Sequence, residues 1–257
     1  MFRREYLVAL QTISYKEIRR FLRIWVQTLL PSTITTTLYF LIFGKLIGSR
    51  IGQMQGYDYM EFIVPGLILM AVISNAYSNV VSSFYGTKFQ HNIEEMLVAP
   101  IPSWVILTGY ISGGVCRGLL VAILVTLVSL FFTDLKIAHP FLMVLVFLLT
   151  GILFSAAGFI NAVYAKSFDD ISIVPTFVLT PLIYLGGVFY SIDLLPTFWQ
   201  KVSMLNPVFY IINVFRHSIL GESDISIING LAVILCFIVV LIFISLRLLN
   251  KGIGIKN

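Results

Sequence analysis

Long stretches without charged side chains recur along the 257 residues of this chain. A helix that crosses about 30 Å of hydrocarbon needs about 20 residues. Four uncharged stretches of at least 21 residues meet this requirement, at positions 24–44, 62–87, 171–192 and 225–246. A fifth runs from 137 to 165, and a sixth, from 103 to 133, is interrupted only by Arg117. The pattern predicts six transmembrane helices, at approximately 24–44, 62–87, 108–133, 140–165, 171–192 and 225–246.

Composition supports this fold class, because 58% of the residues are apolar and only 11% are charged, against about 25% charged in an ordinary soluble protein. We therefore expect an all-α membrane protein in which residues 1–257 form a single transmembrane domain. The net charge of +5 is interpreted as a topology signal, and no nucleic-acid partner is expected. Cys116 and Cys236 both lie in apolar stretches, so neither a disulfide framework nor a thiolate metal site is predicted.

The first 23 residues carry a basic helical pattern. Lys16, Arg19, Arg20 and Arg23 are spaced i, i+3, i+4 and i+7, which places them on one face of a helix. Apolar residues occupy the positions beside this face: Leu10, Ile13, Ile18, Phe21, Leu22 and Trp25. The pattern predicts an amphipathic interfacial helix over 1–23, lying on the cytoplasmic leaflet. A solvated basic helix before the first span is the alternative.

The distribution of Lys and Arg predicts the orientation of the chain. With six spans and the N-terminus inside, the cytoplasmic segments collect eleven of the 17 Lys and Arg residues and the outside loops collect five. Arg117 accounts for the remaining one. Because cytoplasmic loops carry the excess of Lys and Arg, both termini are expected in the cytoplasm.

The predicted cytoplasmic segment 89–104 is not an ordinary loop. Two adjacent carboxylates, Glu94 and Glu95, precede an apolar turn and two prolines, Pro100 and Pro102. Proline lacks a backbone donor and disfavours helix at the preceding residue, so a short amphipathic helix is predicted to end here. Such a helix either docks into the groove of a partner or contacts only lipid headgroups.

The segment after the fifth predicted span is too short to cross the membrane. Residues 202–215 are uncharged, but 14 helical residues extend only about 21 Å at 1.5 Å per residue. Pro196 and Pro207 divide the region into two short helical arms, and non-helical backbone at membrane depth must pack on protein or face a wet cavity. The segment is predicted to dip into the membrane and return.

The predicted spans contain no Asp or Glu, whereas ion-coupled carriers usually place a carboxylate near the midplane. Arg117 is expected to snorkel to an interface or to pair inside a dimer. Close helix contacts are predicted where small residues recur at i and i+4, at Gly44 and Gly48, Gly109 and Gly113, and Gly114 and Gly118. Threonines in the first and fifth spans either line a pathway or satisfy carbonyls of their own helix at a kink.

Two parts of the sequence resemble the ABC-2 type membrane permease family. The run Glu94–Ile101 is similar to the cytoplasmic coupling segment that precedes the third span in that family. The runs Pro181–Tyr190, Leu195–Pro196, Leu205–Tyr210 and Arg216–Gly221 are similar in order and spacing to its C-terminal signature. Together with the six spans and the basic N-terminal helix, the resemblance covers essentially the whole chain.

The resemblance implies a permease subunit of an exporter in the bacterial inner membrane, a homodimer that binds two copies of an ABC ATPase subunit and contacts membrane lipid. It implies a re-entrant helical pair within 194–220, and transport outward of an amphipath such as a lipid-linked glycan or a drug. ATP and Mg would be held by the partner ATPase, since no cofactor is expected in this chain and no G-x-x-x-x-G-K-[ST] phosphate loop occurs in it.

Candidate site residues follow from this resemblance. Contact with the ATPase is expected from residues of the coupling segment: Glu94, Glu95, Met96, Leu97, Ala99 and Pro100. A smaller cytoplasmic contact between the fourth and fifth spans is expected from Asp169 and Asp170 with Lys166, although these residues also fit a solvated turn. The resemblance favours a route between subunits formed by the first, second and fifth spans, with candidate lining residues Thr33, Thr36, Tyr39, Asn75, Thr176, Thr180 and Tyr184.

Two other functions were weighed. An intramembrane enzyme is disfavoured, because the metalloprotease patterns need a second histidine near His91, while His139 and His217 are placed on the opposite side of the membrane. No G-x-S-x-G nucleophile motif is present. An ion-coupled secondary transporter is the alternative function, and dependence of transport on ATP hydrolysis or on an ion gradient distinguishes the two.

Overall fold

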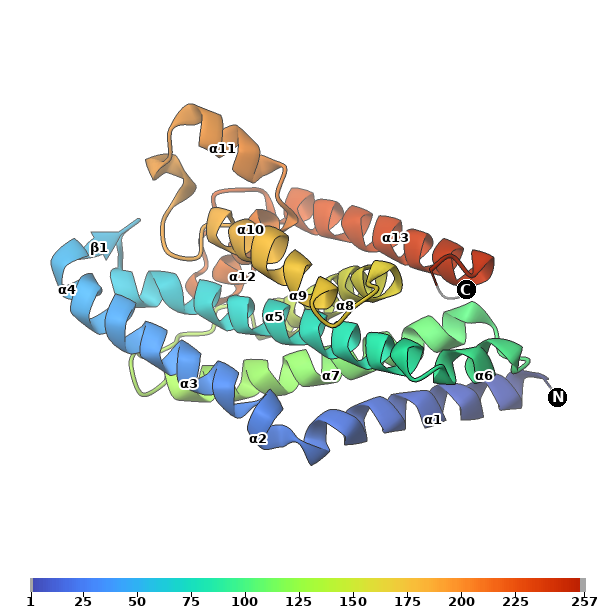
Figure 1. Cartoon of the computed structure of the whole chain (residues 1–257). Coiled ribbons are helices and arrows are strands. Elements are labelled where there is room, and N and C mark those ends of the chain that lie inside the picture. Colours follow the sequence, from blue (N-terminus) through green and yellow to red (C-terminus); the bar gives the residue numbers. More distant parts are fainter. Residues whose placement is uncertain (1, 255–257) are drawn as a thin grey trace.

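The protein is an elongated bundle of helices (Figure 1). The computed structural model describes residues 2–254, apart from the side chains of Phe2, Arg3 and Leu97. The α-helices are α1 (Phe2–Arg23), α2 (Trp25–Thr28), α3 (Leu30–Tyr39), α4 (Gly48–Ile51), α5 (Tyr59–Phe89), α6 (Asn92–Val98), α7 (Ser103–Ser129), α8 (Pro140–Tyr164), α9 (Asp170–Val174), α10 (Thr180–Leu185), α11 (Thr197–Met204), α12 (Pro207–Leu220) and α13 (Ile227–Lys251). Two π-helical stretches, Phe40–Ile47 and Pro175–Leu179, join α3 to α4 and α9 to α10, and Ile192–Leu194 is a 3₁₀ turn.

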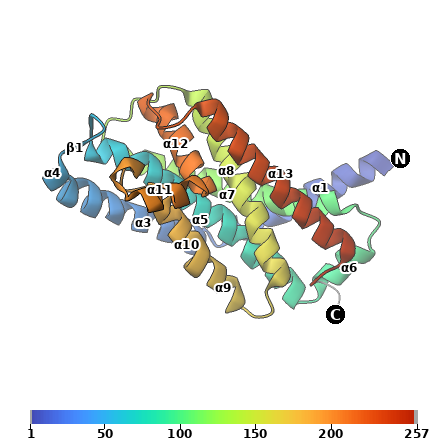
Figure 2. The ribbon, with the colours of Figure 1, turned by 90° about the horizontal axis from the view of Figure 1, so that it is seen from above.

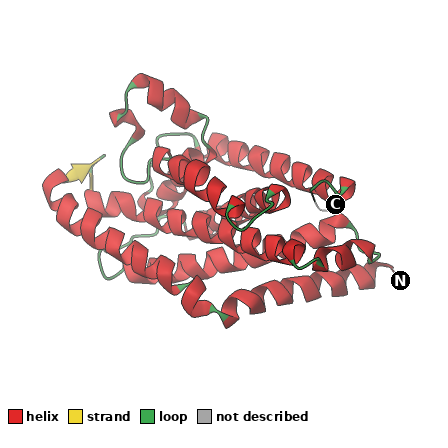
Figure 3. Cartoon of the chain, viewed as in Figure 1, coloured by secondary structure: helices red, strands yellow, loops and turns green. Residues whose placement is uncertain are grey.

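Helices dominate the chain, as Figure 3 shows, and this confirms the all-α prediction. Five continuous helical segments are long and apolar enough to cross a membrane: Trp25–Ile51, Tyr59–Phe89, Ser103–Ser129, Pro140–Tyr164 and Ile227–Lys251. They correspond to five of the six predicted spans. The remaining predicted span, 171–192, corresponds to the shorter apolar segment Asp170–Leu185.

Local sequence explains where helix boundaries differ from the predicted spans. The segment Asp170–Leu185 ends before 192 because Gly187 adopts φ +84°, a backbone conformation that glycine reaches without steric cost. The third span begins at Ser103, directly after Pro102, as one continuous helix without a separate interfacial segment. The first begins with a break, since Ile24 and Leu29 interrupt the helix around α2 and Pro31 removes a donor from the first turn of α3.

Helix α5 is the centre of the bundle. Its side chains are buried over most of its length, because α7, α8, α12 and the segment containing α3 all pack against it. Figure 2 shows α13 running along α8 on the outer side of this core. A helix that is buried on nearly every side is apolar on nearly every side, which explains the uncharged run at 62–87.

Close contacts are present at five of the six glycines that the spacing predicts, whereas a Cβ on Gly118 would meet its neighbours only at 3.4 Å or more. A Cβ atom placed on Gly114 or Gly158 would lie 2.9 Å from the Ala76 carbonyl oxygen and 2.6 Å from the Tyr77 carbonyl oxygen of α5, respectively. Gly113 is equally close to α1, and Gly44 and Gly48 face Met60 and Tyr59 at the start of α5. Small residues thus permit the close approach of neighbouring helices.

A two-stranded hairpin that the sequence analysis did not anticipate lies at one end of the bundle. Strands β1 (Gln53–Met54) and β2 (Tyr57–Asp58) pair antiparallel through a two-residue loop. Gln55 and Gly56 both have positive φ, 53° and 83°, as a type I′ turn requires. Gln55 Nε2 donates to Ser191 Oγ at 2.9 Å and to Asp224 Oδ1 at 2.8 Å, so the hairpin is tied to the segments before α11 and α13.

The two ends of the bundle differ in content. The start of α1, the end of α13 and the short helix α6 lie at one end, while α4 and the hairpin lie at the other (Figures 1 and 2). Helix α11 projects from the side of the hairpin end (Figure 1). Both ends of the described chain therefore share one end of the bundle with the predicted cytoplasmic segment.

Candidate functional site

Helix α6 connects α5 to α7. It follows α5 after His91, whose left-handed conformation (φ 59°) turns the chain. It ends at Ala99, which is extended before Pro100, as the sequence predicts. Glu94, Glu95 and Pro100 are exposed and Ala99 is half-buried, while the side chain of Leu97 lies outside the described residues. The outer face of α6 thus presents two carboxylates to solvent.

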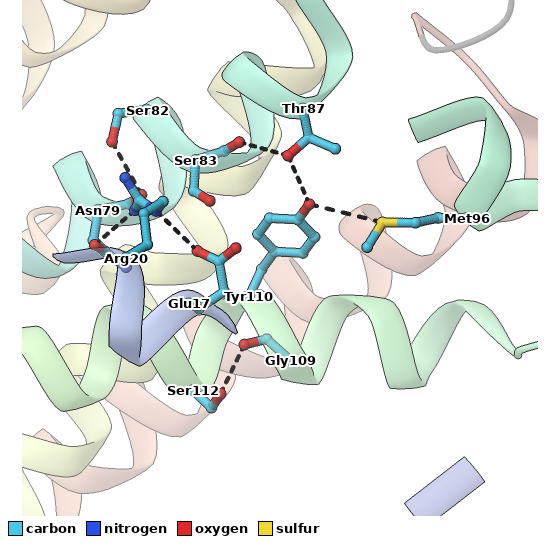
Figure 4. Close-up of polar contacts among 10 residues, drawn as sticks. All are labelled: Glu17, Arg20, Asn79, Ser82, Ser83, Thr87, Met96, Gly109, Tyr110 and Ser112. Carbon is cyan, nitrogen blue, oxygen red and sulfur yellow. Dashed lines mark hydrogen bonds and ion pairs between the residues drawn. The ribbon is translucent and has the colours of Figure 1, made fainter. Parts of the chain in front are cut away.

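The inner face of α6 is fixed to the core. Ile93 is buried in the apolar cluster at this end of the bundle. Met96 Sδ lies 3.9 Å from Tyr110 Oη of α7, and the Tyr110 hydroxyl donates to Thr87 Oγ1 of α5 at 3.0 Å (Figure 4). Helix α6 is thus in contact with both of the helices that flank it, α5 and α7.

A cavity of about 460 Å³ opens beside α6. It is lined by residues of α5, α6, the end of α8 and the chain after α13: Tyr85, Lys88, Phe89, His91, Ile93, Glu94, Val163, Tyr164, Ala165, Lys166 and Gly254. Lys88 Nζ donates to the carbonyl oxygens of Val163 and Ala165 at 2.7 and 2.8 Å. A cation at the C-terminal carbonyls of a helix is favourable, so Lys88 links the end of α5 to the end of α8.

The two aspartates between α8 and α9 have different surroundings. Asp170 Oδ2 accepts hydrogen bonds from the backbone N–H groups of Lys166 at 2.8 Å and Ser167 at 3.1 Å. These donors, led by the Lys166 N–H, hold the pKa of Asp170 below its usual value. Asp169 is exposed. The carboxylate of Asp170 is thus occupied in its own turn, whereas the side chain of Asp169 extends into the open.

Helix α1 packs along α7. Its buried stripe consists of Ile13, Glu17 and Phe21, spaced four residues apart, and a Cβ on Gly109 or Gly113 of α7 would collide with Ile13 or Glu17. The predicted helix is present over Phe2–Arg23, while Met1 lies outside the described residues. Of the apolar residues that the helical pattern places beside the basic face, however, Leu22 and Trp25 are exposed.

An ion pair between two residues of α1, Glu17 and Arg20, faces α5 (Figure 4). Glu17 is fully buried, and its Oε2 lies 3.4 Å from Arg20 Nε. Arg20 Nη2 donates to the carbonyl oxygen and to Oδ1 of Asn79, both at 2.9 Å. Sequence reasoning did not single out Glu17, although a carboxylate placed midway between Ile13 and Phe21 on one helix face was the available signal.

Arg117 of α7 lies in the same seam, the line along which α1, α5 and α7 meet. Its Nε donates to Asn75 Oδ1 at 3.1 Å and its Nη2 donates to the Thr28 carbonyl at 3.0 Å. Asn75 Nδ2 in turn donates to Ser32 Oγ at 2.7 Å. Arg117 therefore binds within its own chain, at the break between α2 and α3, and it connects α7 to α5 and to the first span.

A second cavity, of about 310 Å³, lies between α3, α5 and α10. Its lining contains hydroxyl, amide and aromatic groups: Pro31, Ser32, Thr35, Thr36, Tyr39, Met70, Ala71, Ser74, Asn75, Thr180, Ile183 and Tyr184. Five of the seven candidate pathway residues belong to this lining, namely Thr36, Tyr39, Asn75, Thr180 and Tyr184.

The other two candidate pathway residues lie outside the cavity lining. The hydroxyls of Thr33 and Thr176 donate to the carbonyls of Leu29 and Ser172. Thr36 and Thr180 also donate to carbonyls of their own helical segments. Local satisfaction of backbone carbonyls, the alternative interpretation, is thus present at all four threonines.

The region after α10 contains the two predicted helical arms, α11 and α12. Asn206 begins α12, accepting the Val208 N–H at 3.0 Å and donating to the Leu182 carbonyl at 2.6 Å. Buried Arg216 stacks 3.9 Å from the centre of the Phe62 ring and donates to the Gly187 carbonyl at 2.8 Å. These bonds attach α12 to α5 and to the turn after α10.

The three histidines do not form one site. The rings of His139 and His217 stack with their centres 5.1 Å apart, where α12 meets the start of α8. His91 lies beside α6, with Nδ1 3.1 Å from Glu94 Oε1. Within the described part of the chain, no group of three or more His, Cys, Asp or Glu side chains is arranged to hold a metal ion.

Comparison with known proteins extends over most of the chain. Residues 8–220 match the family model described as ABC-2 type transporter. The inner membrane transport permease YadH of Escherichia coli K12 is 58% identical over 252 residues, which cover 98% of each chain. Nodulation protein J of Rhizobium leguminosarum bv. viciae is 24% identical over 230 residues, 87% of each chain. Nodulation protein J of Rhizobium meliloti is 24% identical over 220 residues, 83% of this chain and 82% of the relative.

Proposed function

Since this chain belongs to the ABC-2 type transporter family, we propose that it is the permease subunit of an exporter powered by a separate ATPase. As a member of the family it is a transport permease, and it is a multi-pass protein of the inner membrane. Two copies would form the transmembrane pathway, and two ATPase subunits would bind on the cytoplasmic side. The observation that carries the proposal is the attachment of α6, a short helix with an acidic outer face, to both α5 and α7.

In this proposal α6 is the coupling helix. Glu94, Glu95, Met96, Leu97, Ala99 and Pro100 form the contact with the ATPase. The exposed carboxylates at 94 and 95 supply charge for recognition, while Ile93 and the contact of Met96 with Tyr110 pass the movement to the core. Closure of the ATPase dimer would then displace the ends of α5 and α7 together. Asp169 would contribute a smaller contact at the α8–α9 turn, with Asp170 shaping that turn from within.

The topology that fits this role places both termini and α6 in the cytoplasm. The chain forms one transmembrane domain over 1–257, in which residues 171–185 are the fifth of six spans and α1 lies at the cytoplasmic interface. At about 1.5 Å per residue this segment is about 22 Å long, so α11 and α12 would complete the outer half of the membrane as a re-entrant pair. Burial of α12 against α5 and α8 supports this arrangement.

The cavity between α3, α5 and α10 would belong to the transport pathway. It joins the first, second and fifth spans, and a second copy facing the exposed apolar side of α3 would enclose it. Ile34, Leu38 and Leu41 are all exposed on that side. Its lining contains no Asp or Glu, which favours ATP-driven transport of an amphipath over ion-coupled transport. Lipid-linked glycans, drugs and similar amphipaths fit its mixed hydroxyl and aromatic lining.

ATP and Mg would be bound by the partner subunit. The chain has no phosphate loop, and backbone N–H groups of such a loop are what holds the nucleotide phosphates in P-loop ATPases. The role left to this chain is to convert the displacement of α6 into movement of the spans.

The proposal is tested by reversing charge on α6. We expect the double substitution Glu94→Lys with Glu95→Lys to reduce permease-dependent ATPase activity at least tenfold, measured on the permease reconstituted with its ATPase. Glu222→Lys, an equal change per residue at the hairpin end of the bundle, is the matched control and should have little effect. Unchanged ATPase stimulation and unchanged complex assembly in the double variant would show that α6 is not the coupling contact.

A further inference from the structure

Arg117 carries a positive charge that is hydrogen-bonded but not neutralised. Its two acceptors, Asn75 Oδ1 and the Thr28 carbonyl oxygen, are both uncharged. A guanidinium has five N–H donors, so most of its donors are available beyond these two bonds. Removing a cation from water without an anion is costly, so an anion bound close to Arg117 would be stabilised.

Among the described residues, no carboxylate forms an ion pair with Arg117. Glu17 is the nearest buried acid on the same seam, and it pairs with Arg20 at 3.4 Å. The three buried or half-buried charges of the seam, Glu17, Arg20 and Arg117, therefore sum to +1. The uncharged stretches of a second copy also contain no Asp or Glu.

The charge acts on the cavity between α3, α5 and α10 through one residue. Asn75 accepts from Arg117 and also lines the cavity, as does Ser32, which accepts from Asn75 Nδ2 at 2.7 Å. Because the Ser32 oxygen is already an acceptor, its own O–H is directed to donate elsewhere. One end of the cavity thus has an adjacent cation and a hydroxyl donor, while Met70, Ile183 and Tyr184 supply apolar surface.

The Asn75 amide donates both of its hydrogens within the chain, to Ser32 Oγ and to the Ala71 carbonyl at 2.9 Å. We propose that this cavity binds an amphipath with an anionic headgroup, whose phosphate, sulfate or carboxylate accepts from the Ser32 hydroxyl and offsets the charge of Arg117 behind Asn75. The inference deepens the proposed function, since it assigns a substrate class to the proposed pathway. A bilayer lipid with the same headgroup chemistry would satisfy the same site. Hydrogen bonds to charged groups are stronger than those between neutral groups, so an anionic ligand should bind about tenfold more tightly or better than its uncharged analogue.

Native mass spectrometry of the full-length protein in a neutral detergent tests this preference. The probes are a lysophosphatidic acid and a monoacylglycerol with the same acyl chain, which differ only in the phosphate. We expect at least tenfold tighter binding of the lysophosphatidic acid to the unmodified protein. Equal binding of the two probes would overturn the proposal.

Two variants separate charge from folding. Arg117→Gln removes the cation, and Asn75→Asp leaves it in place but adds a carboxylate at the position where Asn75 Oδ1 lies 3.1 Å from Arg117 Nε. Both should abolish the preference for the phosphate, whereas Lys201→Gln, which removes an exposed cation on α11, should retain it. If Asn75→Asp folds normally and still prefers lysophosphatidic acid, the headgroup does not bind next to Arg117.

Transport assays on the protein reconstituted with its ATPase distinguish a cargo from a resident lipid. They also distinguish failure of the anion site from failure of the proposed function. ATP-dependent movement of lysophosphatidic acid across the bilayer, lost in Asn75→Asp, would identify the anionic amphipath as cargo. Binding without movement would identify a resident lipid in the same site. Anion preference in a protein that transports no amphipath with ATP would leave the site valid and contradict the proposed function. ATP-driven transport with no anion preference would contradict the site alone.

Discussion

At the scale of single residues, the charges between α1, α5 and α7 each have a specific role. Arg20, paired with Glu17, holds α1 against Asn79, and Arg117 holds the break before α3 against Asn75. Composition suggested that charge in this chain was chiefly a signal for topology. The structure adds that some of the basic residues counted for topology, Arg20 among them, also organise the packing of the first helix.

Substitution of Glu17 tests this role directly. Glu17→Gln keeps the shape of the side chain but leaves Arg20 without its anion in a largely buried place. Breaking a fully buried ion pair costs about 3–5 kcal/mol, and because Arg20 is 29% exposed we expect a smaller loss, about 1–3 kcal/mol of the free energy of unfolding. Thermal unfolding in detergent measures the loss. Glu5→Gln, an exposed acid on the same helix, is the control, and equal stability of both variants would rule out a structural role for the pair.

The turn between α8 and α9 should respond to acid. The pKa of Asp170 is lower in the folded protein than in the unfolded chain because its carboxylate accepts backbone hydrogen bonds. Its contribution to stability is therefore complete above the unfolded pKa of about 3.9 and is lost as the pH falls through the lower folded value.

Amide hydrogen exchange at Lys166 and Ser167, measured at neutral pH, reports how well the Asp170 carboxylate holds these two N–H groups. We expect Asp170→Asn to increase exchange at both amides, because the amide side chain is a weaker acceptor than the carboxylate. Asp169→Asn should leave exchange unchanged, since Asp169 is exposed. Equal exchange in the two variants would mean that Asp170 does not hold the turn.

At the scale of elements, close packing of α1 on α7 depends on glycine. A Cβ on Gly113 would lie 2.6 Å from Glu17 Cβ, whereas a Cβ on Gly86 meets open space. We expect Gly113→Ala to destabilise the protein by about 1–3 kcal/mol through this overlap. Gly86→Ala should be neutral or stabilising, because alanine favours a helix interior over glycine. Thermal unfolding of the two variants compares them, and equal melting temperatures would contradict the packing of α1 described here.

The elements that sequence predicted well are those fixed by a single local property. Lack of charge over about 20 residues located five long apolar helices, and two prolines located the end of α6 and the break between α11 and α12. Packing partners were less accessible. The basic periodicity of residues 16–23 predicted a helix, but nothing in that pattern indicates that Gly109 and Gly113 lie opposite Ile13 and Glu17. The hairpin was missed because each of its strands has only two residues.

At the scale of the whole molecule, the structure connects one end to the other through α5. Helix α6 and Lys88 lie at one end of α5, Asn79 and Asn75 face the seam with α1 and α7, and Arg216 stacks on Phe62 near the hairpin at the other end. A displacement of α6 therefore acts on a helix that contacts nearly every other part of the bundle.

The candidate site could be predicted only in part, for a physical reason. Residues that share a segment, such as those of α6, are neighbours in any fold. The cavity joins α3, α5 and α10, which are distant in sequence, and of seven candidate residues Thr33 and Thr176 face away from it because small changes in helix rotation decide which threonine faces the cavity. Resemblance to a family supplied the three spans, while the structure supplied Ser32 and the link to Arg117.

The role proposed for this chain is that of the membrane half of an ATP-driven transporter. Purification in mild detergent from the native host, followed by mass spectrometry of the intact complex, tests it most directly. We predict two copies of this chain with two copies of a protein that contains a phosphate loop. Recovery of the chain as an intact oligomer with no ATPase, even after chemical crosslinking in the membrane, would contradict this role.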